Sequence, residues 1–513
     1  MTLGELVSAA PSAAQPAGDG EAFRQISGQA LARPVTSVAY DSRQVVPGAV
    51  FVAMRGQKTD GLAYVRQAID RGALAIVAET PAPPDIAARG VGWIQAADAH
   101  LALAELAAAF YGHPSRELLL IGITGTNGKT TTSYLVCSIF DSAGVPCGRI
   151  GTVGYRFPAR SGATNGEERE AARTTPEAPD LQAMLREMVN RGAGACAMEV
   201  SSHALVLRRA DGLRFAAAIF TNLTRDHLDF HRDMESYFAA KRRLFEILPE
   251  GAPSAVNLDD PRGGVVAATA SRPVTYAIDR HADVTPGPLA LSLDGLTFDA
   301  RTPRGTLRLR SRLVGRPNVY NILAAVTCAV ALDAPLGAIE KGIAALEQVP
   351  GRFQVVSGPG DDVRVVVDYA HTDDALKNLL ETARPLAGGR VITVFGCGGD
   401  RDTTKRPLMG AVAARLSDLV VVTSDNPRSE DPERIIEDIK RGLVPGRVPW
   451  LAIADRAQAI ERAVKDARTG DLVLIAGKGH ETTQTIGSRI LPFDDVDVAR
   501  AALVRRRTGS HVG

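Results

Sequence analysis

Short apolar runs alternate with segments of helical spacing along most of the chain. Strand candidates of this kind before residue 250 are AVFVAM (49–54), LAIVAE (74–79), LLLIGIT (118–124), ACAMEV (195–200) and FAAAIF (215–220). Helical patterns separate them, as at 63–70 and in TTSYLVCSIF (131–140). This alternation predicts parallel βαβ units and therefore an α/β fold.

The pattern changes at two places further on. From 289 to 313 the apolar period drops to two, as in TLRLRSRL (306–313), which predicts a few antiparallel strands added to the parallel sheet. The turn-rich VPGR (349–352) then indicates a boundary. Four more apolar runs follow it: VRVVVDYAHT (363–372), RVITVFGCGGDRD (390–402), DLVVVTSDNPR (418–428) and DLVLIAGKGHE (471–481).

We therefore expect three domains. They are a small N-terminal α/β domain (1–112), a central parallel-sheet domain with a phosphate loop (113–349) and a Rossmann-like C-terminal domain (350–513). A length of 513 residues fits this division, because one domain typically takes ~150 residues. In the central and C-terminal domains polar residues follow the apolar runs, and ligands of open α/β sheets bind beyond the carboxyl ends of the strands.

Composition and charge exclude several classes of protein. Hydrophobic residues make up 45% and charged residues 23%, which is ordinary for a globular chain. The net charge is +1, so no overall field favours nucleic acid or an anionic membrane. Apolar stretches such as 323–332 are shorter than the ~18 residues of a membrane span, and the N-terminus does not resemble a signal peptide. We expect a cytoplasmic monomer with reduced, structural cysteines.

The strongest local motif is TGTNGKT (124–130), between a predicted strand and a predicted helix. Backbone N–H groups of such a loop bind phosphate oxygens, Lys129 can neutralise the β- and γ-phosphates, and Thr130 can offer its hydroxyl to Mg²⁺. The motif departs from the common G-x-x-x-x-G-K-[ST] form, since Ile123 stands where the first glycine would be. The order of strand, loop and helix still favours ATP binding over an ordinary glycine-rich turn.

Two other strand ends carry groups that suit a nucleotide-bound metal. EVSSH (199–203) ends one predicted strand, and TNLTRDHLD (221–229) follows the next. Mg²⁺ prefers oxygen ligands, so Glu199 is the better candidate ligand, and His227 is a candidate for a second ion. A single Glu or His usually has a structural role, but these two share a sheet edge with the phosphate loop.

The motifs together resemble those of the Mur ligases, ATP-dependent amide-forming enzymes of peptidoglycan precursor synthesis. The matching segments, in family order, are DSR (41–43), GQKTDG (56–61), TGTNGKT, TTP (174–176), EVSSH, TNLTRDHLD, YFAAKRRLF (237–245), GRPNVYNILAA (315–325), PGRF (350–353), DYAHTDDAL (368–376), GCGGDRD (396–402), DNPR (425–428) and GKGHE (477–481). The pattern is most similar to members that add meso-diaminopimelate to a UDP-N-acetylmuramoyl dipeptide.

The resemblance implies a reaction with ATP, Mg²⁺ and small-molecule substrates. ATP phosphorylates a carboxylate of the dipeptide, and an amine displaces the phosphate. The family pattern makes Lys129, Glu199, His227 and Lys241 the catalytic candidates, with Thr130, Glu199, His227 and a CO₂-derived carbamate on Lys241 as metal ligands. Sequence alone would treat Lys241 as a charged helix residue like its neighbours Arg242 and Arg243.

The resemblance also assigns substrate contacts. ATP contacts are expected at Gly125, Thr126, Asn127, Gly128, Lys129, Thr130, Thr131, Asn318, Asn321, Arg352 and Asp368. UDP-sugar-peptide contacts are expected at Ser42, Gln57, Lys58, Thr59, Thr174, Thr175, Ser201 and Arg209, although Leu207 departs from a glutamine common in the family. Asn318 could equally be an ordinary helix-capping residue.

The incoming amino acid can be argued from charge. Diaminopimelate carries a second α-amino carboxylate, which needs a guanidinium for its carboxylate and an acceptor for its ammonium. The expected contacts are Arg401, Asp425, Asn426, Pro427, Arg428, Gly477 and Glu481. Arg428 would repel the bare ammonium of lysine. The ordinary alternative is that Arg428 pairs with Glu430 or Asp431 on the surface.

Three rival functions stay open from the sequence. A lysine-adding Mur ligase and a folylpolyglutamate synthase-type ligase share the acyl-phosphate chemistry. A phosphate-loop switch or motor is a rival of another class, but it would not need Arg401, Arg428 and Glu481 at strand ends.

Overall fold

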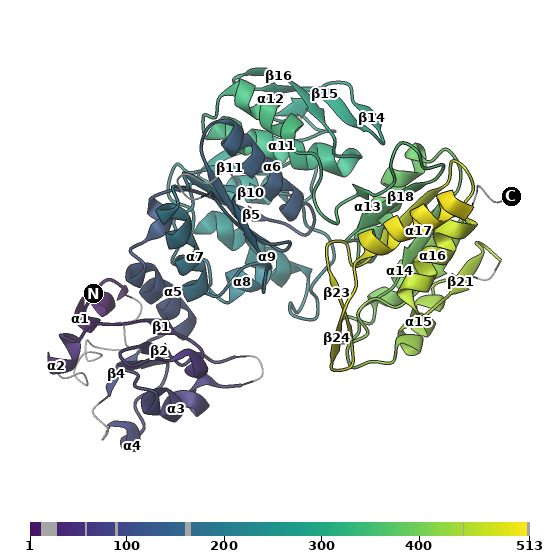
Figure 1. The fold of residues 1–513 in the computed structure, drawn as a ribbon. Coiled ribbons are helices and arrows are strands. Elements are labelled where there is room, and N and C mark those ends of the chain that lie inside the picture. Colours follow the sequence, from purple (N-terminus) through teal and green to yellow (C-terminus); the bar gives the residue numbers. More distant parts are fainter. Residues whose placement is uncertain (12–27, 57–58, 88–90, 160–165, 445, 510–513) are drawn as a thin grey trace.

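The computed structural model describes residues 1–11, 28–56, 59–87, 91–159, 166–444 and 446–509. Figure 1 shows three α/β parts that follow one another along the chain, with the central part between the other two. The expected α/β architecture is confirmed.

The N-terminal part is a four-stranded parallel sheet with helices around it. In sheet order its strands are β1 (Val38–Ala39), β2 (Val50–Val52), β3 (Ala75–Ala78) and β4 (Gly92–Gln95). Its helices are α1 (Leu3–Ser8), α2 (Gly28–Leu31), α3 (Val65–Asp70), α4 (Pro84–Ala87) and α5 (Ala99–Phe110). The two runs predicted from the sequence are β2 and β3. The short β1 and the glycine-initiated β4 carry too weak an apolar pattern to be predicted.

The central part is built on an eight-stranded sheet. Its strands, in sheet order, are β12 (Arg272–Tyr276), β11 (Pro253–Asn257), β10 (Ala217–Phe220), β5 (Leu119–Thr124), β9 (Ala195–Glu199), β6 (Cys147–Ile150), β7 (Tyr155–Phe157) and β8 (Glu167–Arg169). All pairs from β12 to β6 are parallel, and β7 and β8 are antiparallel. Its helices are α6 (Lys129–Ser142), α7 (Ala178–Asn190), α8 (Ser202–Val206), α9 (Met234–Glu246), α10 (Gly263–Thr269) and α11 (Arg316–Ala331).

This sheet order explains why the predicted motifs converge. β5 lies between β10 and β9, with Thr124 opposite Phe220 and Ile123 opposite Glu199. Apolar side chains alternate between the two faces, so Ile121 and Ile123 pack with α6 and α11 while Leu120 packs on the other side. The carboxyl ends of all three strands therefore meet at one edge.

The predicted antiparallel strands form a separate small sheet. It contains β13 (Thr285–Pro286), β14 (Ala290–Ser292), β15 (Gly295–Thr302) and β16 (Gly305–Ser311), covered by α12 (Leu336–Ala345). In β16, Leu307 and Leu309 are buried while Arg308 and Arg310 are exposed, which is the period of two seen in the sequence.

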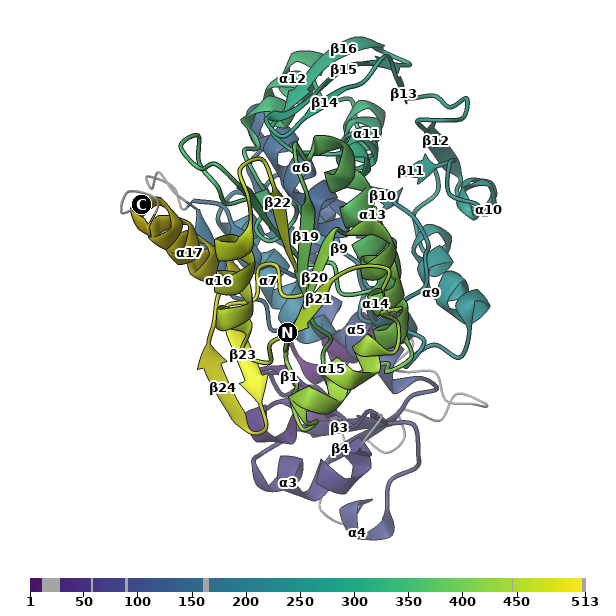
Figure 2. The ribbon, with the colours of Figure 1, turned by 90° about the vertical axis from the view of Figure 1, so that its right-hand side faces the viewer.

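The C-terminal part is a six-stranded sheet between two helical layers (Figure 2). Its order is β17 (Gln354–Val355), β18 (Arg364–Asp368), β22 (Leu472–Ala476), β19 (Val391–Phe395), β20 (Leu419–Val422) and β21 (Trp450–Ala452), with only β17 antiparallel. The helices are α13 (Asp373–Ala383), α14 (Lys405–Leu416), α15 (Pro432–Lys440), α16 (Arg456–Asp466) and α17 (Asp495–Gly509). A hairpin of β23 (Thr483–Ile486) and β24 (Arg489–Pro492) projects from this part.

Two general properties follow from the described residues. No helix among them combines the length and the apolar character needed to cross a bilayer. All five cysteines are buried and unbridged, where they act as small apolar side chains.

Candidate active site

The TGTNGKT segment forms a compact loop between β5 and α6, as its sequence predicts. Gly125 and Gly128 have positive φ angles of 147° and 86°. A Cβ atom at Gly128 would lie 2.3 Å from Asn321 Oδ1, and one at Gly125 would lie 1.9 Å from Thr221 Oγ1. Glycine is therefore required at both positions, and α6 begins with backbone N–H groups directed at the space above the loop.

Two lysines, Lys241 fully buried and Lys129 partly buried, converge on this loop. Lys129 Nζ donates to the carbonyl oxygens of Gly125 and Thr126, both at 2.8 Å, and Lys241 Nζ donates to Gly125 O at 2.7 Å. Burial lowers the pKa of Lys129 and lowers that of Lys241 well below its ordinary value, with the charge of Lys129 adding to the second effect. Among the charged side chains of α9 in the described structure, only Lys241 forms a hydrogen bond with the loop.

Glu199 ends β9 and is held in a fixed orientation. Thr152 donates its backbone N–H to Oε1 and its hydroxyl to Oε2, each at 3.0 Å. A Cβ atom at Gly151 would lie 2.2 Å from Oε1, so the carboxylate approaches the backbone where no larger residue fits. Glu199 is 1% exposed, and it lines the same cavity as the phosphate loop.

His227 follows β10 in a loop and has a positive φ of 54°. Its Nε2 lies 3.5 Å from Asp226 Oδ2, and its ring packs edge-on against His203 at 5.0 Å between centroids. Burial lowers the pKa of His227 to about 4, so the ring is neutral near pH 7 and its nitrogen can act as a ligand.

The nucleotide candidates surround the loop from both the central and the C-terminal parts. Arg352 Nη2 donates to Thr130 Oγ1 at 3.2 Å, and Asn321 Nδ2 donates to Asn318 Oδ1 at 2.9 Å. Asp368 accepts the backbone N–H groups of Phe353 and Ala370, and burial raises its pKa. Asn318 also donates to Val314 O at 2.8 Å, but Gly315 is the N-cap of α11 and no described side chain caps this helix, so the capping role weighed for Asn318 is not found.

The amino-acid candidates lie at the adjacent ends of β19, β20 and β22. Arg428, with a φ of 52°, donates from Nη1 to Gly399 O at 2.7 Å. Among the described residues it has no ion pair with Glu430 or Asp431, and Glu430 is bound to Arg406 instead. The surface pairing weighed for Arg428 is therefore not found, and its guanidinium lines a cavity together with Arg401 and Glu481.

Two cavities adjoin at this point. The first, of about 260 Å³, is lined by 126–131 with Glu199, Lys241, Asn318, Asn321, Arg352 and Asp368. The second, of about 560 Å³, is lined by Arg401, Asp425, Asn426, Arg428, Gly477 and Glu481. Asp226, His227, Tyr369, His371 and Thr372 line both. Pro427 does not line the second cavity, but its neighbours on both sides do.

The UDP-sugar-peptide candidates are more dispersed. Thr174 and Ser201 line the first cavity, and Thr175 donates to Glu199 O at 2.8 Å behind it. Arg209 is paired with Glu177 at 2.6 Å. Ser42 is bound to Gln67 at 2.7 Å in the N-terminal part and Thr59 is exposed there, while Gln57 and Lys58 lie outside the described residues.

Comparison with known proteins agrees with this geometry. Three family models match in order: "Mur ligase family, catalytic domain" at 34–111, "Mur ligase middle domain" at 123–329 and "Mur ligase, glutamate ligase domain" at 351–479. The chain belongs to the Mur ligase family.

Two relatives and one solved structure that are similar to this Mur ligase share the same description. The UDP-N-acetylmuramoyl-L-alanyl-D-glutamate–2,6-diaminopimelate ligases of Geobacter metallireducens and Solibacter usitatus are each 46% identical to it. They cover 93% and 98% of this chain, which spans 95% and 98% of theirs. A solved structure with the same description is 32% identical, with a TM-score of 0.67 and 99% of both chains covered. These relatives confirm the resemblance found in the sequence.

The donors in this Mur ligase suit a hard cation. No cluster of three or more His, Cys, Asp or Glu side chains able to hold a metal occurs within the described ranges. The Glu199 carboxylate and the Thr130 hydroxyl are oxygen donors of the kind Mg²⁺ takes, and Mg²⁺ commonly completes its shell with substrate phosphates and water. The residues present therefore fit a metal that binds together with a nucleotide.

Two residues of the Mur ligase site were not singled out from the sequence. Thr152, which holds Glu199, follows β6, a strand too short and polar to stand out. His371 lies in the DYAHT segment, where only Asp368 was selected; burial lowers its pKa, and its carbonyl oxygen accepts from Lys405 Nζ at 2.8 Å. The signal that could have found both is their position directly after a strand.

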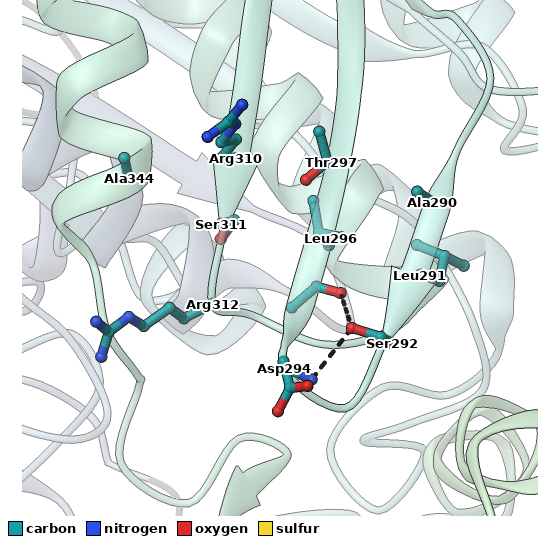
Figure 3. A pocket seen from close by; sticks show the side chains of 11 residues that line it. Ala290, Leu291, Ser292, Asp294, Leu296, Thr297, Arg310, Ser311, Arg312 and Ala344 are labelled. Atoms are coloured by element: carbon teal, nitrogen blue, oxygen red, sulfur yellow. Dashed lines mark hydrogen bonds between the residues drawn. The ribbon is translucent and has the colours of Figure 1, made fainter.

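Another cavity of about 400 Å³ lies away from this site, beside β14, β15 and β16 (Figure 3). There Ser292 Oγ donates to Gly295 O at 3.3 Å and accepts from the backbone N–H of Asp294 at 3.2 Å, so its polar groups serve the turn. No predicted site residue lines it.

Proposed function

We propose that this chain is the ligase that joins meso-diaminopimelate to UDP-N-acetylmuramoyl-L-alanyl-D-glutamate, using ATP, in peptidoglycan precursor synthesis. The observation that carries the proposal is the adjoining pair of cavities, one around a phosphate loop and one around Arg401, Arg428 and Glu481. A ligase of this type needs the phosphorylated carboxylate and the attacking amine to meet. The shared description of the relatives supports the same reaction.

The chemistry places specific demands on the first cavity. A carboxylate attacks the γ-phosphorus of ATP to give an acyl phosphate and ADP, and the amine then attacks the acyl carbon and releases phosphate. Both reactants of the first step are anions, so cations must offset their repulsion. Lys129 and Arg352 supply positive charge at the loop, Lys129 beside Gly125 and Arg352 beside Thr130. Mg²⁺, when bound, neutralises phosphate charge, with Thr130 and Glu199 as its protein ligands.

The role of Lys241 is part of the proposal. Carbamylation requires a neutral amine, and burial of Lys241 favours that form. Its amine nitrogen attacks CO₂, forms the N–C bond and loses a proton, and the product is an anionic oxygen donor beside the loop. The carbamate would place an anion next to Lys129, whose Nζ contacts the same carbonyl oxygen of Gly125.

The wider assignments belong to the same proposal. We assign 1–112 to the UDP-sugar, 113–349 to ATP and 350–513 to the amino acid, with Ser42, Thr174, Thr175, Ser201 and Arg209 contacting the sugar and peptide. The enzyme acts as a cytoplasmic monomer on these small molecules.

Phosphate release with each substrate omitted in turn tests the function. Release is expected only when ATP, Mg²⁺, UDP-N-acetylmuramoyl-L-alanyl-D-glutamate and meso-diaminopimelate are all present, and mass spectrometry should find the tripeptide product. Turnover without an amino acid would indicate a switch or motor. Preference for a folate and glutamate, or for lysine, would indicate one of the two rival ligases.

A further inference from the structure

Lys478 is a lysine whose side chain is completely buried beside the candidate amino-acid cavity. It lies in the GKGHE segment between Gly477 and Glu481, and it has no role in the proposed reaction. Its Nζ donates to Thr483 O at 2.6 Å, to Glu481 Oε2 at 3.0 Å and to Asn426 Oδ1 at 3.4 Å. An ammonium has three donors, so none is left for a substrate.

These contacts connect the DNPR segment, the GKGHE segment and the hairpin of β23 and β24 to the Lys478 ammonium. Asn426, from the DNPR segment, donates Nδ2 to Glu481 Oε2 at 2.7 Å and accepts the backbone N–H of Thr485 at 2.9 Å. The hairpin strand β23 also contacts the DNPR segment through Gln484, whose Nε2 donates to Asp425 O at 2.7 Å. Lys478 is the only charged group in this set that contacts Glu481 among the described residues.

The arrangement leaves one carboxylate oxygen of Glu481 available. Lys478 and Asn426 both donate to Oε2, whereas Oε1 has no hydrogen bond from any described residue. Glu481 lines the cavity together with Arg428 and Arg401. A substrate ammonium at Oε1 and a substrate carboxylate at the guanidinium of Arg428 would match an α-amino carboxylate, which is neutral overall.

We propose that Lys478 is a positioning residue that holds Glu481 and Asn426 in the geometry that receives the far α-amino-carboxylate end of the amino-acid substrate. The inference rests on the proposed function and extends it to a residue that does not touch the substrate. The physical reason is that a nearby buried cation holds a half-buried carboxylate in one rotamer and offsets the cost of its partial removal from water. Without Lys478, Glu481 would turn toward water and Asn426 would lose both of its charged neighbours.

Steady-state kinetics of Lys478→Met test the proposal, since methionine keeps most of the side-chain volume but lacks the charge. The KM for meso-diaminopimelate should rise about 10- to 100-fold, the size expected for loss of a hydrogen-bonded charge pair. The KM values for ATP and for the UDP-linked dipeptide should stay unchanged. Lys440→Met is the matched control, because Lys440 forms an exposed i,i+3 pair with Glu437 in the same part of the chain. It should leave all three KM values unchanged.

A double-mutant cycle separates positioning from a purely structural effect. If Lys478 acts through Glu481, the KM of the double variant for diaminopimelate should be less than about threefold higher than that of Glu481→Gln alone. The inference would be overturned if the fold-change in KM of the double variant equalled the product of the two single fold-changes. It would also be overturned if Lys478→Met folded and had an unchanged KM for diaminopimelate. Should Lys478→Met not fold, Glu481→Gln alone remains decisive, because normal diaminopimelate binding by that variant also overturns it. A wild type that does not ligate diaminopimelate would instead refute the proposed function.

Discussion

Lys129 and Lys241 share the carbonyl oxygen of Gly125, although they come from different helices. Neither amine has a carboxylate partner at hydrogen-bond distance in the described structure. Burial lowers the pKa of both amines, and more so for Lys241. Such a site favours an anion beside the loop, whether it arrives as phosphate or forms on Lys241 itself.

Lys241→Ala tests the second of these alternatives. The variant should be nearly inactive, because it lacks the side chain that would carry the carbamate. Added short-chain carboxylates such as acetate should restore part of the ligation rate, since they can supply the missing anionic oxygens in the vacated space. Phosphate release with and without acetate measures the effect, and Arg242→Ala on the neighbouring position is the control. Full activity of Lys241→Ala without additive would refute the carbamate role.

Arg428→Ala tests the choice of amino acid. If Arg428 binds the distal carboxylate, its loss removes a charge-assisted contact and should lower kcat/KM for meso-diaminopimelate by roughly 30- to 1000-fold. Lysine lacks that carboxylate, so its kcat/KM should fall far less or rise. The ratio of the two values is the readout, because a general defect lowers both alike. An unchanged ratio, or a wild type that prefers lysine, would contradict the assignment.

His231→Gln tests whether His231 contributes to the pH dependence of the free energy of unfolding. His231 is 4% exposed and contacts Ser202 Oγ at 2.9 Å, and burial, assisted by His203, lowers its pKa to about 4. Its pKa in the unfolded chain is about 6.5. As pH falls from 6.5 to 4 the unfolded state binds a proton that the folded state does not, so the free energy of unfolding decreases.

Urea denaturation of the ligand-free enzyme between pH 7 and pH 5 measures this contribution. His231→Gln should show a shallower loss of stability over this range than the wild type. The exposed His281 provides a control, and His281→Gln should keep the wild-type slope. Equal slopes in all three proteins would mean that His231 does not contribute.

At the scale of elements, a buried ion pair joins two helices to the strand ends that form the second cavity. Arg456, at the start of α16, donates from Nε and Nη2 to Asp495, at the start of α17, both at 2.7 Å. Its remaining donors reach Ser424 O after β20 and Ala476 O in β22. Neither side chain is exposed, so this pair fixes the positions at which the DNPR and GKGHE segments begin.

Arg456→Met should destabilise the enzyme by about 3–5 kcal/mol, because it leaves Asp495 buried without its partner. The double variant Arg456→Met, Asp495→Leu should recover part of this loss, since it removes both charges. Arg462→Met breaks the exposed pair of Arg462 with Asp466 in the same helix and should cost under ~1 kcal/mol. Chemical denaturation followed by circular dichroism measures all three. A loss for Arg456→Met no larger than that for Arg462→Met would contradict the role of the pair.

At the scale of the whole molecule, polar contacts join the three parts. Tyr40 donates to Asp180 at 2.7 Å and Arg208 to Asp98 at 2.8 Å between the N-terminal and central parts. Between the central and C-terminal parts, Asn127 donates to Asp374 at 3.3 Å and Arg225 to Asp402 at 3.4 Å, both near the phosphate loop. Nucleotide bound at the loop would therefore lie directly between these two parts.

We expect the molecule to become more compact when ATP, Mg²⁺ and the UDP-linked dipeptide bind together. All three parts must contribute to one reaction centre, and phosphate charge between Lys129 and Arg352 draws the parts together. Small-angle scattering should show a smaller radius of gyration at saturating ligand than in the free enzyme. The same measurement on Lys129→Ala, which lacks a phosphate contact, should show less compaction. No change in the wild type would contradict the expectation.

Most strands that carry chemistry were predicted from local pattern, because apolar runs such as 118–124 and 472–476 are properties of adjacent residues. The strands β6, β7, β11 and β12 were missed, since they are short or polar and gain their stability from neighbours in the sheet. Because β6 was not predicted, Thr152 after it was not recognised as a site residue. Its role depends on its contact with Glu199 at the end of the neighbouring strand β9.

The sequence by itself determined the order of strand, loop and helix at 118–140 and the polar residues at the strand ends. Local periodicity and glycine conformation are sufficient for these features. Only the tertiary structure decided that β5 lies between β10 and β9, and that Thr130 meets Arg352 from the C-terminal part. It also decided that Lys241 is buried while Arg242 points outward to Glu246. Strand order and helix facing depend on packing between distant segments, which no local pattern encodes.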